Sequence, residues 1–138
     1  MTASPNRLIA TVLGGVYLAV GAAGFTVTGA FGFAAPAGGL LLGFIQLNGL
    51  QNVLHLLIGV VLLLIGRLSV PRAKTGNAVI GTATLILGLV GLFVSGSAGN
   101  ILALNGAGNA LHFATAIVLL AASLGAEKAI PSKNVHNR

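Results

Sequence analysis

The chain contains the stretch Leu47-Asn48-Gly49-Leu50-Gln51-Asn52-Val53-Leu54-His55, and 57 residues later it contains Leu104-Asn105-Gly106-Ala107-Gly108-Asn109-Ala110-Leu111-His112. Both stretches carry the same two leucines, two asparagines, glycine and histidine at the same spacing. The likeness continues into Val61-Leu62-Leu63, which recurs as Val118-Leu119-Leu120. The second half of the chain is therefore predicted to repeat the architecture of the first.

The composition is that of an integral membrane protein. Of 138 residues, 56% are hydrophobic and only 6% are charged, whereas about a quarter of the residues in a soluble protein are charged. Crossing roughly 30 Å of hydrocarbon takes about 20 apolar residues, and runs of that kind cover residues 8–29, 48–66, 76–95 and 106–125. Because backbone groups in lipid must be satisfied internally, these spans are predicted to be helices, with almost no strand.

The first and third spans also match each other, at an offset of 67 residues: Gly14, Gly21 and Gly24 recur as Gly81, Gly88 and Gly91. We therefore predict one all-α integral membrane domain over residues 1–138, a polytopic four-helix bundle made of two tandem helical hairpins. The first repeat covers 8–66, the second covers 76–125, and a polar tail covers 126–138. Because each repeat has two spans, both enter the membrane from the same side, which makes a parallel repeat.

Two connecting segments carry separate expectations. Residues 30–47 are predicted to lie at the membrane interface as a short helix or an irregular segment anchored by Phe31, Phe33 and Phe44; alternatively, the second helix begins early, near Gly38. Residues 67–74, which include Pro71, are predicted to form a tight turn on the opposite side of the membrane.

The basic residues fall on one side of this arrangement, because the connections 30–47 and 96–105 contain no charge of either sign. By the positive-inside rule, both termini lie in the cytoplasm of a bacterial cell, with the protein in the plasma membrane. The net charge of +6 is therefore interpreted as a topology signal with weak attraction to lipid headgroups, and no nucleic-acid partner is expected. The basic residues are Arg7, Arg67, Arg72, Lys74, Lys128, Lys133 and Arg138.

Polar and small residues recur every three or four positions along the second and fourth spans, so they share one helix face in each. Such faces are typical of membrane helix interfaces, and we expect them to meet each other, or the glycine-rich first and third helices, at the centre of the bundle. Asn48 and Asn105 suit helix N-caps. The faces comprise Asn48, Asn52, His55, Gly59, Leu62 and Gly66, and Asn105, Asn109, His112, Ala116, Leu119 and Ser123. The predicted helix-packing residues are Gly14, Gly21, Gly24, Gly59, Gly81, Gly88, Gly91 and Ala116.

His55 and His112 are the candidate functional residues, because each is expected roughly 10 Å below the outer surface and ionisable groups at such depth are functional candidates. They could form a structural pair that shares a polar network with Asn52 and Asn109, with no cofactor. They could instead ligate a b-type haem or hydrogen-bond a quinone headgroup. No metal site is expected, because two histidines without a nearby carboxylate or thiolate leave most of a coordination sphere to water.

Catalysis is not expected. The sole acidic residue, Glu127, follows the fourth span, so no buried carboxylate pair is available for acid and base work. We predict a non-catalytic accessory or structural subunit of a larger bacterial membrane complex, with respiratory-chain complexes as the preferred host and with other integral subunits and lipids as partners. The alternative is a haem b or quinone-binding redox module that uses His55 and His112. A third reading is a stand-alone envelope or stress protein.

The stretches Gly43-Phe44-Ile45-Gln46-Leu47-Asn48-Gly49-Leu50-Gln51-Asn52-Val53-Leu54-His55-Leu56 and Leu104 to His112 resemble domain of unknown function family 4383, a group of small four-helix membrane proteins of actinobacteria. The resemblance covers the second to fourth spans, and the paired asparagines and histidines are its distinctive part. It implies a four-span protein of the plasma membrane and supplies no activity.

Overall fold

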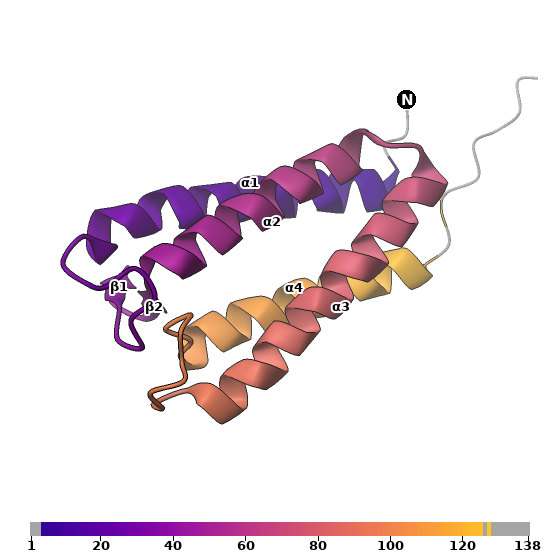
Figure 1. Ribbon diagram of the computed structural model, residues 1–138. Helices are drawn as coiled ribbons and strands as arrows, with labels where there is room; N and C mark the ends of the chain where they lie inside the picture. The colour runs from indigo at the N-terminus through magenta and orange to yellow at the C-terminus, as the bar shows by residue number, and fades with distance from the viewer. Residues whose placement is uncertain (1–3, 126, 128–138) are drawn as a thin grey trace, which may run out of the picture.

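The computed structural model, which describes residues 4–125 and 127, is a bundle of four helices arranged as two hairpins (Figure 1). The helices are α1 (Pro5–Thr28), α2 (Gly49–Arg67), α3 (Val70–Val94) and α4 (Gly106–Leu124). Each is long and apolar enough to cross a membrane, so the predicted helical class and the four spans are confirmed. The start of α1 and the turn between α2 and α3 lie at one end of the bundle, and the longer connections lie at the other.

Two helices begin earlier than predicted, and both have a proline in the first turn. Pro5 stands in the first turn of α1, where the Ser4 side chain caps the helix, and Pro71 stands in the first turn of α3. Proline suits this position because its missing amide hydrogen would have no helical partner there. The prediction of a tight turn over 67–74 is therefore corrected: only Leu68 and Ser69 separate α2 from α3.

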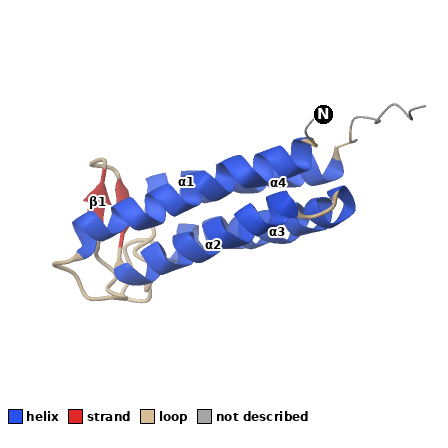
Figure 2. Ribbon diagram, turned by 90° about the horizontal axis from the view of Figure 1, so that it is seen from above, coloured by secondary structure: helices blue, strands red, loops and turns tan. Residues whose placement is uncertain are grey.

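The segment before α2 forms a small antiparallel sheet, which the prediction of almost no strand missed. Strand β1 (Gly39–Leu41) pairs with β2 (Ile45–Leu47), with Gly39 opposite Leu47. The turn between them uses Gly43 at φ +82°, a left-handed conformation that glycine adopts readily. Figure 2 shows this hairpin at one end of the bundle. Both helix predictions for this segment, a short helix within 30–47 and an early start of the second helix near Gly38, are therefore wrong, because the two strands occupy these residues and α2 begins at Gly49.

The glycines predicted to pack helices lie between the two helices of the same hairpin. A Cβ atom at Gly14 would lie 2.9 Å from the carbonyl oxygen of Gly59 on α2. A Cβ atom at Gly88 of α3 would lie 2.9 Å from the Phe113 ring on α4. Each hairpin is thus a closely packed helix pair, and contacts within a hairpin are more extensive than contacts between the two.

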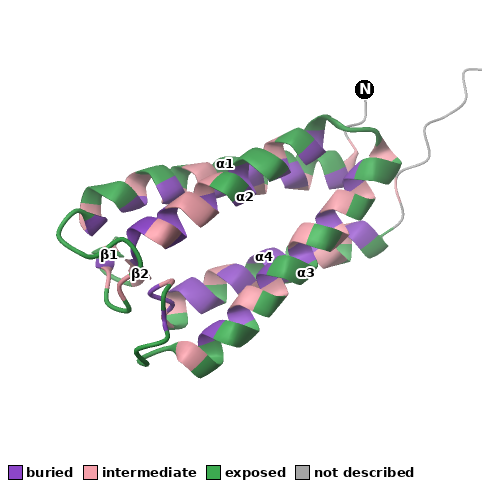
Figure 3. Ribbon diagram, in the orientation of Figure 1, coloured by how far each residue is buried: buried purple, intermediate pink, exposed green. Residues whose placement is uncertain are grey.

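Side chains from all four helices fill the space between the hairpins, whereas the outer faces are apolar and exposed (Figure 3). Large hydrophobic side chains are exposed along every helix, and Phe93 reaches 85% exposure. Apolar surface of this extent is rare on soluble monomers and suits contact with lipid. The buried apolar core comprises Ala10, Tyr17, Ile58, Leu62, Ile65, Ala73 and Leu119.

Candidate functional site

The two predicted histidines meet at the centre of the bundle. His55 of α2 and His112 of α4 are fully buried, and their ring centroids lie 5.6 Å apart with the ring planes inclined at 40°. Neither ring faces the lipid side. The repeated stretches of sequence therefore place two imidazoles against each other across the boundary between the hairpins.

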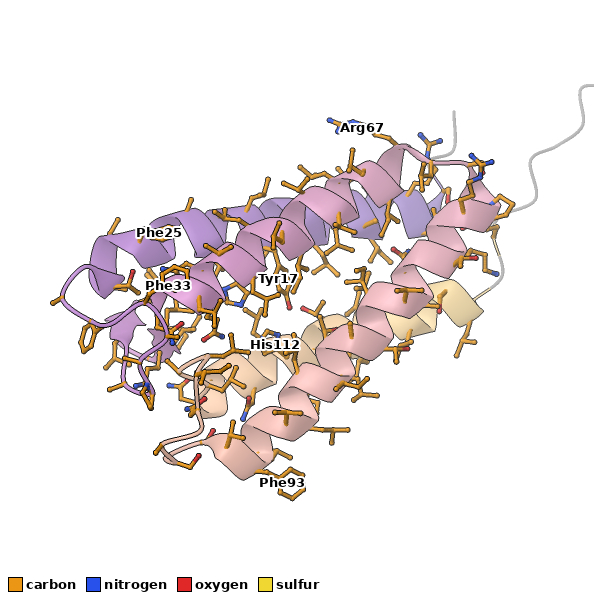
Figure 4. The ribbon with its side chains drawn as sticks, in the orientation of Figure 1. Tyr17, Phe25, Phe33, Arg67, Phe93 and His112 are labelled. Atoms are coloured by element: carbon orange, nitrogen blue, oxygen red, sulfur yellow. The ribbon has the colours of Figure 1, made fainter. Side chains whose placement is uncertain are left out.

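Tyr17 of α1 completes this centre, and Figure 4 shows it with His112 in the space between the hairpins. The Tyr17 ring packs edge-on against His55, with centroids 5.3 Å apart and an interplanar angle of 79°. Its hydroxyl donates to Oγ1 of Thr115 at 3.2 Å and lies 3.4 Å from Nδ1 of His112. The polar groups at the centre thus come from α1, α2 and α4.

Several buried polar atoms of this cluster have no hydrogen-bond partner among the residues that the structure describes. They are both ring nitrogens of His55, Nε2 of His112 and both amide atoms of Gln51. Gln51 stands one helical turn before His55, and its amide nitrogen lies 3.8 Å from the position that a Cβ atom of Gly108 on α4 would take. Buried polar groups are rarely left unpaired, so this cluster is the candidate binding site. We call Tyr17, Gln51, His55, His112 and Thr115 the central polar cluster.

Asn52 and Asn109, which were predicted to share a network with the histidines, are directed to the other helix of their own hairpin. The amide nitrogen of Asn52 donates to Oγ1 of Thr28 on α1 at 3.0 Å. A Cβ atom at Gly24 would overlap Oδ1 of Asn52, and one at Gly91 would overlap Oδ1 of Asn109. Each amide oxygen therefore lies against a glycine Cα, where a weak C–H···O contact can form. In the described residues, no hydrogen bond joins either amide to a histidine ring.

The two predicted N-cap residues cap their helices and also link the hairpins at the end of the bundle that carries the two longer connections, which we call the outer end after the predicted topology. Oδ1 of Asn48 accepts from the backbone amide of Gln51, and Oδ1 of Asn105 accepts from that of Gly108. The Asn48 amide nitrogen donates to the carbonyl of Ile101 at 2.8 Å, and the Asn105 amide nitrogen donates to the carbonyl of Phe44 at 2.8 Å. Phe44 and Ile101 each precede the capping asparagine by four residues. The exchange is therefore reciprocal, and we call it the asparagine clasp.

A second polar group closes the opposite end of the bundle. Asn77 of α3 donates to the carbonyl and to Oδ1 of Asn6 on α1, at 3.0 and 2.9 Å. The Asn6 amide in turn donates to Glu127 at 2.6 Å, and the Ser4 hydroxyl donates to the same carboxylate oxygen at 2.9 Å. The chain after α4 therefore returns to the start of α1 at Glu127. The rest of the predicted polar tail lies outside the described residues.

This contact predicts a pH dependence. The hydrogen bond from Asn6, together with that from Ser4, lowers the pKa of Glu127. A carboxyl whose pKa is lower in the folded protein stabilises it fully above the ordinary pKa, about 4.3 for Glu, and loses that contribution as the pH falls through the lowered value. The Asn6 side-chain amide resonance is therefore expected to titrate with a midpoint below pH 4.3. Glu127→Gln is the control, in which this titration is absent; a midpoint at or above the ordinary value in the unaltered protein would contradict the contact.

Sequence reasoning missed Tyr17, Gln51 and Thr115 as members of the site. The repeat directs attention to residues that recur, but the counterparts of these three are Thr84, Gly108 and Ile58. Helical spacing could have identified Gln51, because it stands four residues before His55. Nothing in the sequence alone brings Tyr17 of α1 to Thr115 of α4, since that contact depends on how the hairpins pack.

A bundle of four helices, each apolar enough to cross a membrane, with polar side chains at its centre fits a small polytopic membrane protein. The chain belongs to the DUF4383 family, a domain of unknown function, whose model matches residues 7–125. The match confirms the resemblance and extends it to the first helix. Comparisons with curated proteins and with solved structures give no match.

Proposed function

We propose that this protein is a non-catalytic accessory subunit of a larger complex in the bacterial plasma membrane, and that it acts through contacts of its helices. The observation that carries the proposal is that polar side chains lie inside the bundle and apolar side chains lie outside it. The amide and imidazole side chains of the spans are buried within the bundle, and large apolar side chains are exposed along every helix. Such a surface offers neighbouring helices and lipids a packing face. Respiratory-chain complexes are the first hosts to examine.

The proposal includes an orientation and an internal symmetry. Arg7, Arg67, Arg72 and Lys74 lie near one end of the bundle, and Arg67 is seen there in Figure 4; the positive-inside rule puts that end in the cytoplasm. The asparagine clasp, with equivalent residues in equivalent roles, supports two parallel repeats about a pseudo-twofold axis. The histidine pair would then lie near that axis.

Partner contact is expected along α3, where exposed Val79, Ile86 and Phe93 repeat every seven residues with 60, 54 and 85% exposure. Spacing of this kind keeps side chains on one face, as a packing seam requires. Tagged protein, expressed at native level and purified in mild detergent, should bring down larger integral subunits. The triple alanine variant of these residues should lose them while retaining its helical circular dichroism. The control is Leu57→Ala combined with Leu64→Ala, which changes exposed leucines of α2 and should retain the partners. Recovery of only a monomer or homodimer with the unaltered protein would contradict the proposal.

The second candidate function is a redox module centred on His55 and His112, favoured by their unpartnered nitrogens. The arrangement does not fit a haem. Two nitrogens bound at about 2 Å on opposite sides of one metal hold the ring centroids more than about 6 Å apart and require a flat macrocycle between them. Here the centroids are 5.6 Å apart, and the buried Tyr17 ring packs beside both imidazoles. A quinone-type headgroup, which needs only hydrogen bonds, is the form of this candidate that we retain.

A further inference from the structure

The central polar cluster breaks the likeness between the two halves of the chain. At the offset of 67 residues, Tyr17 corresponds to Thr84 of α3, and at the offset of 57 residues, Thr115 corresponds to Ile58 of α2. Thr84 bonds its own helix, because its hydroxyl donates to the carbonyls of Ile80 and Gly81. Only His112 therefore lies beside a tyrosine hydroxyl, and the two histidines are chemically unequal.

This inequality sets the tautomer of His112. Tyr17 has one hydroxyl hydrogen, which it donates to Thr115, so its oxygen is left to accept from Nδ1 of His112. A neutral imidazole with its proton on Nδ1 presents a lone pair at Nε2. The ring is neutral because a buried charge needs a partner, and the described carboxylate, Glu127, is bonded at the far end to Asn6. His112 therefore requires a hydrogen-bond donor at Nε2.

His55 carries the hydrogen-bond donor that complements the acceptor on His112. Both of its ring nitrogens are buried without a partner among the described residues, and a neutral imidazole carries one N–H donor whichever nitrogen holds the proton. The centre thus offers one acceptor on His112 and one donor on His55, with ring centroids 5.6 Å apart. Measured from the ring centroids, a single oxygen with a hydrogen bond of about 2.8 Å to one nitrogen of each ring matches this separation when the two bonds meet at about a right angle.

We propose that His55 and His112 hold one hydroxyl group between them, which donates to Nε2 of His112 and accepts from the N–H of His55. A hydroxyl is the smallest neutral group that can do both. The Gln51 amide, one turn closer to the outer end, adds a donor and an acceptor for a second hydroxyl or for water. The proposal does not require the partner contact along α3.

The two sources of this hydroxyl that we test are a water molecule and a quinol. A quinol carries phenolic hydroxyls that both donate and accept, whereas the carbonyl oxygens of the oxidised quinone only accept. A quinone would leave Nε2 of His112 unpaired, and a site that hydrogen-bonds a hydroxyl discriminates strongly against an analogue that lacks it. The site is therefore predicted to prefer the reduced form if its ligand is lipid-derived.

The experiment uses the full chain, with ¹⁵N-labelled histidine, in lipid nanodiscs. Nitrogen chemical shifts are expected to show the proton of His112 on Nδ1, and magnetisation transfer to both rings is expected from a hydroxyl or water proton other than those of Tyr17 and Thr115. A short-chain quinol and its oxidised quinone are then titrated separately, with binding followed by the thermal unfolding midpoint. Quinol binding at least about tenfold tighter than quinone binding supports the proposal with quinol as the source. Transfer from water protons with no binding of either compound supports it with water as the source.

The matched variant is Thr115→Val, which removes the acceptor of the Tyr17 hydrogen. The hydroxyl then donates to Nδ1 of His112, and the proton moves to Nε2, so the two ring nitrogens exchange their chemical shifts. Tyr17→Phe is a second variant, in which neither tautomer is imposed and both are populated. The proposal is overturned if the unaltered protein carries the His112 proton on Nε2, if no hydroxyl or water proton other than those of Tyr17 and Thr115 lies near the rings, or if quinone binds as tightly as quinol.

Discussion

Gly14→Leu is expected to destabilise the protein by about 3 kcal/mol, whereas Gly15→Leu, one position further along α1, is expected to leave its stability unchanged. A Cβ atom at Gly14 would lie 2.9 Å from the carbonyl oxygen of Gly59 and 2.9 Å from the backbone nitrogen of Leu63. Both atoms belong to the α2 backbone and cannot rotate away, so the two helices must separate. A Cβ atom at Gly15 meets nothing within 4 Å.

The measurement is the free energy of unfolding in detergent micelles, followed by far-ultraviolet circular dichroism as the denaturing detergent fraction is raised. The chain has no tryptophan, so helical signal is the practical probe. The neighbouring glycine makes a strict control, because both variants add the same apolar side chain to the same helix turn. Equal stability of the two variants would show that α1 and α2 do not approach each other at Gly14.

The glycine pattern illustrates how far sequence reasoning reaches. The spacing of Gly14, Gly21 and Gly24 predicts a face suited to close helix packing, because steps of seven and three residues keep small residues on one side of a helix. The spacing does not name the helix that the face contacts. The partner follows from chain connectivity, which makes α2 the nearest helix to α1, and from complementary positions such as Gly59.

The missed strands have a different cause. A rule that excludes strands from the hydrocarbon region applies to the spans, and it was extended to a connection at the end of the bundle. In this connection, strand β1 pairs with strand β2, so the two strands satisfy each other's backbone hydrogen bonds. Gly43, at positive φ, lies in the turn between them. The apolar composition of this segment resembled a span, and Gly43 was the signal that favoured a turn.

The candidate site was predicted in part for a related reason. His55 and His112 were found because they recur, and recurrence at one helical position indicates a matched place in the fold. The chemistry of the site depends on Tyr17 and Thr115, which do not recur and which come from different hairpins. Internal likeness therefore locates the centre, and the departures from it define what the centre can bind.

The asparagine clasp gives the second large effect. Asn48→Ala is expected to lower the free energy of unfolding by about 2 to 3 kcal/mol. The change removes the cap of α2 and the two hydrogen bonds that the Asn48 amide donates to the carbonyls of Ala35 and Ile101. Asn105→Ala is expected to cost about 1 kcal/mol, since Asn105 is only half-buried and donates to one carbonyl, that of Phe44. The free energy of unfolding of each variant is measured as for Gly14→Leu.

Asn48→Asp separates the cap from the clasp. A carboxylate still accepts from the amide of Gln51, so the cap of α2 is retained, but it cannot donate and it places a buried charge against two carbonyl oxygens. This variant should be at least as unstable as Asn48→Ala if the clasp holds the hairpins together, and close to the unaltered protein if only the cap matters. Combining Asn48→Ala with Asn105→Ala should cost less than the sum of the two changes, because both bonds join the same pair of outer segments. If the stability losses of the two single variants add exactly, each asparagine acts on its own helix alone, and the two hairpins are not joined by a clasp at this end.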